Sequence, residues 1–230
     1  MLKAVVCDID GTITDDRRRI SIDAIETLRI FIDRGIPVVL ASGNTLCFLD
    51  SIARMIGTNG AVIGENGGVF QTGFDGTPHI TGDRSLCLHA YDRLVTHFKE
   101  QGITLLPYSM ELRYADVAFA RTVPVDEVVS VIADLPVRVI DTGFAIHLQT
   151  HGISKGSALA ALAPLLSLTP GDFVAVGDSD NDLEMLEVAG YGITMGNGSE
   201  KLKKIADLVT DQKYGEGFSE GLLSALERFG

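Results

Sequence analysis

The sequence predicts an α/β fold, a Rossmann-like, doubly wound parallel sheet with an α+β unit inserted into it. Short apolar runs that end in polar turns alternate with helix-like segments up to residue 81 and again from residue 153. This alternation is typical of a parallel sheet whose strands are joined by helices. Between residues 82 and 152 the expected order is helix, two strands, helix, two strands. We therefore expect residues 1–81 and 153–230 to form a core, and residues 82–152, called the insert, to form a separate α+β unit.

Composition limits the possible classes of function. A chain of 230 residues can bury a large core. Acidic residues outnumber basic ones, 31 against 19, and no basic cluster suits a nucleic acid. A phosphate site in a chain of net charge −12 needs local positive charge from a metal, a lysine or backbone N–H groups. A small anionic partner would meet an unfavourable overall field, so its binding would depend on such local charge.

Cysteine usage and hydropathy bear on location. Cys7, Cys47 and Cys87 are widely spaced and match no zinc site, which favours reduced thiols over a disulfide. Lys3 leads directly into the first apolar run, so we expect no signal peptide, and no apolar run is long enough for a membrane span. The expectation is a cytoplasmic protein with no membrane partner, either a monomer or a homodimer.

The first strand, predicted at residues 4–7, is apolar throughout and is followed by Asp8 and Asp10. The two carboxylates point the same way about 6–7 Å apart, because a strand rises roughly 3.3 Å per residue and its side chains alternate. Gly11 allows a sharp turn after them. Ligands of open α/β sheets bind beyond the carboxyl ends of strands, and a divalent cation would relieve the repulsion between two acids. The stretch alone also fits an acidic helix cap or a structural metal site.

Periodicity and capping predict the elements of the first core segment. Ser21 is a typical N-cap and Gly35 a typical helix end, with apolar residues at helical spacing between them. The next strand stops at Ser42-Gly43-Asn44 before another helix, and N–H groups at a helix start form a natural anion site. Alone, Ser42 is a weak signal, because a serine before a helix is usually just a cap. The expected elements are helices at 22–34 and 46–56, strands at 36–41 and 61–63, and a hairpin of strands 69–71 and 77–80.

The insert and the second core segment are predicted in the same way. His147 alternates with Ile146 and Leu148, so it faces either a cleft or solvent. Since no other metal-ligating residues are suitably spaced around His147, we do not expect it to bind a metal. In the insert we expect helices at 83–101 and 125–135 and strands at 103–106, 113–121, 137–140 and 144–148. After it we expect helices at 157–168, 184–188, 199–206 and 218–229 and strands at 173–176, 192–195 and 208–210.

A second acidic turn, Gly177-Asp178-Ser179-Asp180-Asn181-Asp182, follows the strand at 173–176. So many acids at the end of a strand are costly unless a cation is present. A helix-loop-helix Ca²⁺ site requires a glutamate at position twelve, where this chain has Ala189. Lys155, at a predicted helix start, is by itself an ordinary surface residue.

In combination these segments resemble the four motifs of the haloacid dehalogenase superfamily, most of whose members are phosphatases. The motifs are Asp8-Ile9-Asp10-Gly11-Thr12, Ser42, Lys155 and the second acidic turn, in superfamily order. The resemblance covers the whole chain, and the insert is similar to the type-two α/β cap of that superfamily. A narrower resemblance, to the small archaeal phosphoglycolate phosphatases, rests on overall size and on segments such as Ser42-Gly43-Asn44 and Gly64-Glu65-Asn66-Gly67-Gly68.

The resemblance implies a Mg²⁺-dependent phosphomonoesterase acting on 2-phosphoglycolate. Asp8 is then the nucleophile that forms an aspartyl-phosphate, and Asp10 is the general acid and later the base. Ser42, Asn44 and Lys155 are then the substrate-binding residues. The implied metal ligands are Asp8, Asp178, Asp182 and the backbone carbonyl of Asp10, with Asn181 in support.

Several alternatives remain open at this point. The substrate is alternatively a sugar phosphate, or the phosphoryl acceptor is not water. A phospho-accepting signalling domain is a third reading, against which both Asp10 and the insert argue. Arg17-Arg18-Arg19 forms either a solvated face or a grip on substrate, and Glu65 and Asn66 either face the insert or form a structural turn.

Overall fold

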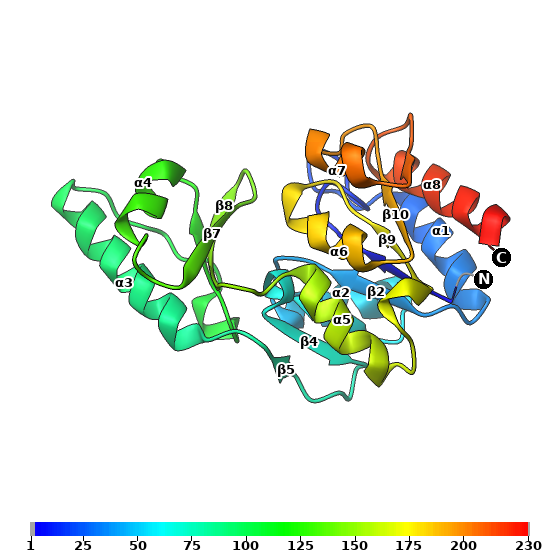
Figure 1. Ribbon diagram of the computed structural model, residues 1–230, viewed down its shortest axis with the longest axis horizontal. Coiled ribbons are helices and arrows are strands. Elements are labelled where there is room, and N and C mark those ends of the chain that lie inside the picture. The colour runs from blue at the N-terminus through cyan, green and yellow to red at the C-terminus, as the bar shows by residue number, and fades with distance from the viewer. Residues whose placement is uncertain (1–2, 230) are drawn as a thin grey trace.

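The structure, a computed structural model, describes residues 3–229 and divides them between two sheets (Figure 1). The strands of the larger sheet are β1 (Ala4–Cys7), β2 (Val38–Ala41), β3 (Ala61–Gly64), β4 (Val69–Thr72), β5 (His79–Ile80), β9 (Phe173–Val176), β10 (Tyr191–Thr194) and β11 (Leu208–Val209). Their order is β11-β10-β9-β1-β2-β3-β4-β5. All pairs from β11 to β3 are parallel, whereas β4 and β5 add an antiparallel edge. The predicted doubly wound core is therefore confirmed.

Helices cover both faces of this sheet. They are α1 (Ile22–Asp33), α2 (Leu46–Ile56), α5 (Lys155–Leu165), α6 (Leu183–Val188), α7 (Glu200–Ile205) and α8 (Tyr214–Phe229). Alternation along β1 sends Val5 and Cys7 into the core under α1, α2 and α8, and Ala4 and Val6 into the core under α5, α6 and α7. Because both faces of β1 are buried, its four residues are all apolar, as is typical of a central parallel strand.

The chain reverses its direction of winding at β1. From β1 it proceeds to β2 and β3 on one side, and it later returns to β9, β10 and β11 on the other. Such a reversal leaves a crevice beyond the carboxyl ends of the two central strands, the usual ligand site of this architecture. The acidic turns after β1 and β9 both lie at this place.

The insert forms the second, smaller sheet, which lies to one side of the core (Figure 1). It contains α3 (Arg84–Glu100), β6 (Val117–Ala120), α4 (Val125–Val131), β7 (Val137–Asp141) and β8 (Ala145–Thr150), and its strand order is β6-β8-β7. Both helices pack on one face, over a hydrophobic cluster that includes Phe98, Phe119 and Ile146. The predicted α+β character of the insert is confirmed.

One predicted strand of the insert is wrong and another is shorter than expected. Residues 103–106 form no strand; only Leu106 and Tyr108 bond to the backbone of β6, and Pro107, which lacks an N–H group, cannot extend the ladder. The strand expected at 113–121 begins only at Val117. The N–H groups of residues 114–116 instead donate to the carboxylate of Glu65 in the core.

Three helices differ from the prediction by two residues or more at an end. Helix α5 begins at Lys155, because Ser154 caps it and exchanges hydrogen bonds with Ser157. Helix α8 begins four residues earlier than expected, at Tyr214, whose N–H is bound by the side chain of Asn197. Helix α4 ends at Val131 instead of residue 135.

Within residues 3–229, no helix is long and apolar enough to cross a bilayer. Cys7, Cys47 and Cys87 are all free thiols, the first and last of them buried.

Candidate active site

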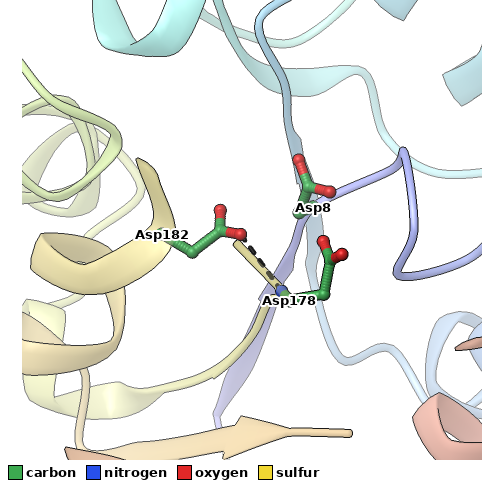
Figure 2. A group of neighbouring side chains, drawn as sticks. All are labelled: Asp8, Asp178 and Asp182. Atoms are coloured by element: carbon green, nitrogen blue, oxygen red, sulfur yellow. Dashed lines mark hydrogen bonds between the residues drawn. The ribbon is translucent and has the colours of Figure 1, made fainter. Parts of the chain in front are cut away.

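Three carboxylates meet at the carboxyl ends of β1 and β9. Cys7 pairs with Val176 in the parallel ladder, so Asp8 and Asp178 leave the sheet close to each other. Asp182 comes from the helical turn that follows Asp178 and approaches the other two from the side (Figure 2). One oxygen of each acid lies within 4.8 Å of the others. The two acidic turns, 170 residues apart in sequence numbering, thus form one site.

Lys155 lies at the base of this group and is completely buried. Its Nζ donates to Asp8 Oδ1 at 2.5 Å and to Asp182 Oδ1 at 2.7 Å. Helix α5 can approach closely because Gly156 packs against the backbone of Glu184. Burial opposes the charge of Lys155, yet the carboxylates of Asp182 and Asp8 raise its pKa above the ordinary value. The lysine therefore provides a permanent positive charge next to Asp8.

The carboxylates carry more negative charge than one lysine can balance. Burial raises the pKa of Asp8 well above its ordinary value; Lys155 opposes this rise, whereas Asp182 and Asp178 add to it. Burial, together with the charge of Asp182, raises the pKa of Asp178 to about 7. A cation placed among the three acids would reverse these shifts, because it favours the ionised forms.

The donors fit a hard divalent cation such as Mg²⁺, since all of them are oxygens. Asp182 has the least capacity left for a metal. Its Oδ1 accepts from Lys155, and its Oδ2 accepts the backbone N–H groups of Asp178 and Ser179, both at 3.1 Å. Of the three acids, Asp8 and Asp178 have the more accessible lone pairs.

A polar loop after β2 borders the same site. Ser42 is buried there, and its Oγ accepts from the backbone N–H and the side-chain amide of Asn44. Asn44 Nδ2 also donates to Asp10 Oδ2 at 3.0 Å. The loop precedes α2, so it offers backbone N–H groups to an anion. The structure therefore brings Asp10, Ser42 and Asn44 together next to Asp8.

A cavity of about 530 Å³ opens over these groups, between the core and the insert. Its core side carries Asp8, Asp10, Asp178 and the Ser42–Asn44 loop. Its insert side carries aromatic side chains, two alanines and His147. Cavities of this volume are typical sites for small molecules. The arrangement suits a small ligand bound between a carboxylate nucleophile and a covering domain.

Comparison with known proteins identifies the family. Residues 5–123 and 125–222 match the family model for haloacid dehalogenase-like hydrolases. The chain belongs to this family. Relatives named phosphoglycolate phosphatase are 53% identical in Methanoculleus marisnigri (224 residues, 96% of each chain) and 40% identical in Archaeoglobus fulgidus (220 residues, 96% of this chain and 95% of the relative). A crystal structure of a Thermoplasma acidophilum protein superposes with a TM-score of 0.86 at 26% identity, over 97% of this chain and 98% of that one.

Membership of the haloacid dehalogenase-like hydrolases confirms the superfamily inferred from the four motifs and makes the protein an enzyme of hydrolytic chemistry. In this hydrolase the four motifs meet at one site, although Ser42 and Lys155 were weak signals in isolation. Lys155 illustrates the point, because nothing in its local sequence distinguishes it from an exposed residue at a helix start.

The loop after β3 links this hydrolase's core to its insert. Glu65 is buried, and its carboxylate accepts backbone N–H groups of Tyr114, Ala115 and Asp116. Burial and the charge of Asp116 raise the pKa of Glu65 to about 7, although the three N–H groups act in the opposite direction. Of the two alternatives for Glu65, contact with the insert is thus the correct one.

Three asparagines near the site make contacts that the sequence analysis did not predict. Asn66, held at a φ of 53°, accepts at Oδ1 a hydrogen bond from Asn181, which is itself bonded to Ser179. Asn197, which had been given no role, donates to the carbonyl of Gly11. The bonds from Asn181 to Asn66 and from Asn197 to Gly11 span long sequence separations, so no local pattern could have identified them.

The three arginines of the flap between β1 and α1 differ in their surroundings. Arg19 pairs with Asp15 on the exposed surface. Arg18 instead stacks on the ring of Phe144 in the insert, 3.4 Å from the ring centroid, and lines the cavity. The interpretation of the arginines as a solvated face is therefore incomplete for Arg18.

Proposed function

We propose that the protein is a Mg²⁺-dependent phosphomonoesterase that hydrolyses 2-phosphoglycolate to glycolate and phosphate through an aspartyl-phosphate on Asp8. The observation that carries this proposal is the buried Lys155, whose charge is held against Asp8 at the base of the cavity. Lys155 orients the nucleophilic carboxylate through Oδ1, and its charge offsets that of the incoming phosphoryl group.

Asp10 is the proposed proton donor. Asp8 attacks phosphorus, the bond to the substrate oxygen breaks, and Asp10 gives that oxygen its proton. Asn44 holds Asp10 Oδ2 at 3.0 Å, which orients the carboxyl group for this transfer. Asp10, now ionised, takes a proton from the water that attacks the phosphorus of the aspartyl-phosphate, which releases phosphate and restores Asp8.

Ser42 and the N–H groups of its loop are the proposed ligands of the phosphate oxygens. Mg²⁺, held by Asp8, Asp178, Asp182 and the backbone carbonyl of Asp10, would supply the positive charge that this acidic site lacks. Residues 82–152 would act as a cap that excludes bulk water while the aspartyl-phosphate forms. We place the activity in the cytoplasm, where the exposed thiol of Cys47 would stay reduced.

The names of the archaeal relatives support 2-phosphoglycolate as substrate. The cavity volume of about 530 Å³ also admits larger phosphomonoesters, so a sugar phosphate is the alternative. The chemistry is the same for both substrates, and their kcat/KM values distinguish them.

The test is phosphate release with and without Mg²⁺ from 2-phosphoglycolate, several sugar phosphates and an aryl phosphate. We expect the highest kcat/KM for 2-phosphoglycolate, and loss of activity without the metal. Asp8→Asn should abolish turnover, whereas Asp16→Asn, on the exposed flap, should leave it unchanged. Retained activity in the Asp8 variant would contradict the mechanism. Equal turnover of many substrates would contradict the substrate assignment alone.

A further inference from the structure

A second charged group faces the cavity from the insert side. It consists of Arg113, Asp116 and His147, called here the cap cluster. On β8, Ile146 and Leu148 pack into the hydrophobic cluster of the insert, so His147 between them lies on the opposite face of the sheet. That face borders the cavity, and His147 lines it while being only 3% exposed. A buried histidine on a cavity wall requires a chemical reason.

Asp116 fixes the geometry of the cap cluster. Its Oδ1 accepts from Arg113 Nη1 at 2.6 Å, and its Oδ2 lies 2.9 Å from His147 Nδ1. Burial would raise the pKa of Asp116, but the hydrogen bond from His147 and the charge of Arg113 keep it below the ordinary value. Because Asp116 stays ionised, Nδ1 carries a proton and donates it. His147 Nε2 is then left without a partner among residues 3–229.

Arg113 connects the cap cluster to the predicted phosphate loop. Its Nε donates to the carbonyl of Tyr108, and its Nη1 donates to the carbonyl of Gly43 at 3.2 Å. Gly43 lies between Ser42 and Asn44, so the cap cluster sits above the loop that would hold the phosphate. On the β6 side a small side chain leaves space next to His147, since its neighbour across that ladder is Ala118; on the β7 side it pairs with Ile140.

Charge divides the cavity into two ends. The core end carries Asp8, Asp10 and Asp178, which would repel any further carboxylate of a substrate. At the insert end, Asp116 balances the charge of Arg113, so this end does not repel a carboxylate. A carboxylate bound there could share a proton with His147 Nε2 in a partly dry site, where charge-assisted hydrogen bonds are strong.

We propose that His147, oriented by Asp116 and Arg113, binds the carboxylate of the substrate and so selects phosphomonoesters that carry a carboxylate near the phosphate. This inference rests on the proposed phosphatase function and names the residue that would determine its specificity. Asp116 and Arg113 act as positioning residues. Sugar phosphates and alkyl phosphates gain no ion pair at this end of the cavity.

His147→Asn is the decisive variant. The amide nitrogen of asparagine can replace Nδ1 as the donor to Asp116, whereas nothing replaces Nε2. We expect kcat/KM for 2-phosphoglycolate to fall roughly 10- to 150-fold, mainly through KM, the effect of one hydrogen bond to a charged group. Turnover of ethyl phosphate, which has the same carbon count but no carboxylate, should change less than about threefold, since it has no group that bonds to Nε2. For 2-phosphoglycolate the loss falls on KM because the contact is uniform binding, present in the ground state and the transition state alike.

Two further variants separate binding from structure. In His147→Gln the amide reaches the position of Nε2, so we expect part of the preference for 2-phosphoglycolate to return even though the bond to Asp116 is lost. His97→Asn is the matched control, because His97 lies on α3 and pairs with Glu127 away from the cavity. This variant should leave kcat/KM unchanged for both 2-phosphoglycolate and ethyl phosphate. Thermal unfolding of each variant checks that the insert remains folded.

The outcomes are distinguishable. Equal losses on both substrates in His147→Asn would make the cap cluster purely structural, and no loss on either would remove it from the site; both results overturn the inference. If wild-type enzyme hydrolyses ethyl phosphate but not 2-phosphoglycolate, the substrate proposal fails. Phospholactate is then compared with ethyl phosphate: a wild-type preference for phospholactate that His147→Asn abolishes supports the inference, and absence of that preference overturns it.

Discussion

Replacing Asp178 by Asn should make the metal-free protein more stable at alkaline pH. Burial and the charge of Asp182 raise the pKa of Asp178 from 3.8 to about 7. A shift of about three units corresponds to ~4 kcal/mol, because one unit is worth about 1.36 kcal/mol. The native state binds this proton more tightly than the unfolded state does. The free energy of unfolding of the metal-free protein therefore falls as the pH rises from about 4 to about 7, and it stays low above that range.

The amide in Asp178→Asn cannot ionise, so this part of the pH dependence should disappear. Weakening of the hydrogen bond from Thr12 costs about 1 kcal/mol, which leaves a net gain of ~3 kcal/mol at pH 8 in EDTA. Mg²⁺ should instead favour the wild type. At a concentration 100 times its dissociation constant it stabilises the wild type by about 2.7 kcal/mol, but the variant, lacking one ligand, should gain much less.

Urea unfolding at pH 5 and pH 8, in EDTA and in Mg²⁺, measures all of these terms. Asp180→Asn is the matched control, because Asp180 belongs to the same turn but is exposed and pairs with Lys201. It should follow the wild type in every condition. If Asp178→Asn unfolds at a lower urea concentration than wild type at pH 8 in EDTA, the charge argument is refuted. If it keeps the full response to Mg²⁺, Asp178 is not a ligand.

Three other perturbations test separate parts of the structure. Lys155→Met should lower kcat by roughly 10²–10³-fold at saturating Mg²⁺, since it removes a charge preorganised against the phosphoryl group. Phosphate release measures kcat, and an unchanged value would exclude the role assigned to Lys155. Gly11→Ala should abolish the rise in Tm caused by Mg²⁺, because Gly11 has a φ of 83° and a Cβ there would collide with the Asp178 carboxylate. Phe31→Ala, in the core beneath α1, should cost about 3–5 kcal/mol in urea unfolding, with kcat per folded molecule unchanged.

Local sequence was sufficient for most elements of the core and for the two acidic turns that follow β1 and β9. The strands are short apolar runs, and the polar turns that end them lie at one edge of the sheet by geometry alone. Asp8 and Asp178 could therefore each be placed at that edge, and the resemblance to the superfamily then joined them in one predicted metal site. The helix cap at Ser21 depends on neighbouring residues, and so did its prediction.

The insert was harder to predict because long-range contacts override its local pattern. Residues 114–116 have strand-like neighbours, but their N–H groups bond to Glu65, which lies about 50 positions away in the chain. Similarly, alternation around His147 fits either orientation, and only the packing of Ile146 and Leu148 decides which face meets the cavity. Tertiary contacts of this kind leave no signature in a short window of sequence.

The contact between Glu65 and the insert has a consequence for protein engineering. The carboxylate of Glu65 accepts main-chain N–H groups of the insert. In the other direction, the side-chain amide of Gln149 in the insert donates to the main-chain carbonyls of Glu65 and Asn66. The identity of the side chain at Tyr114, which points to solvent, does not enter this junction. Libraries randomised at Tyr114 and at the cavity-lining Tyr108 and Ser109 can therefore change ligand preference while the main-chain contacts between the core and the insert are kept.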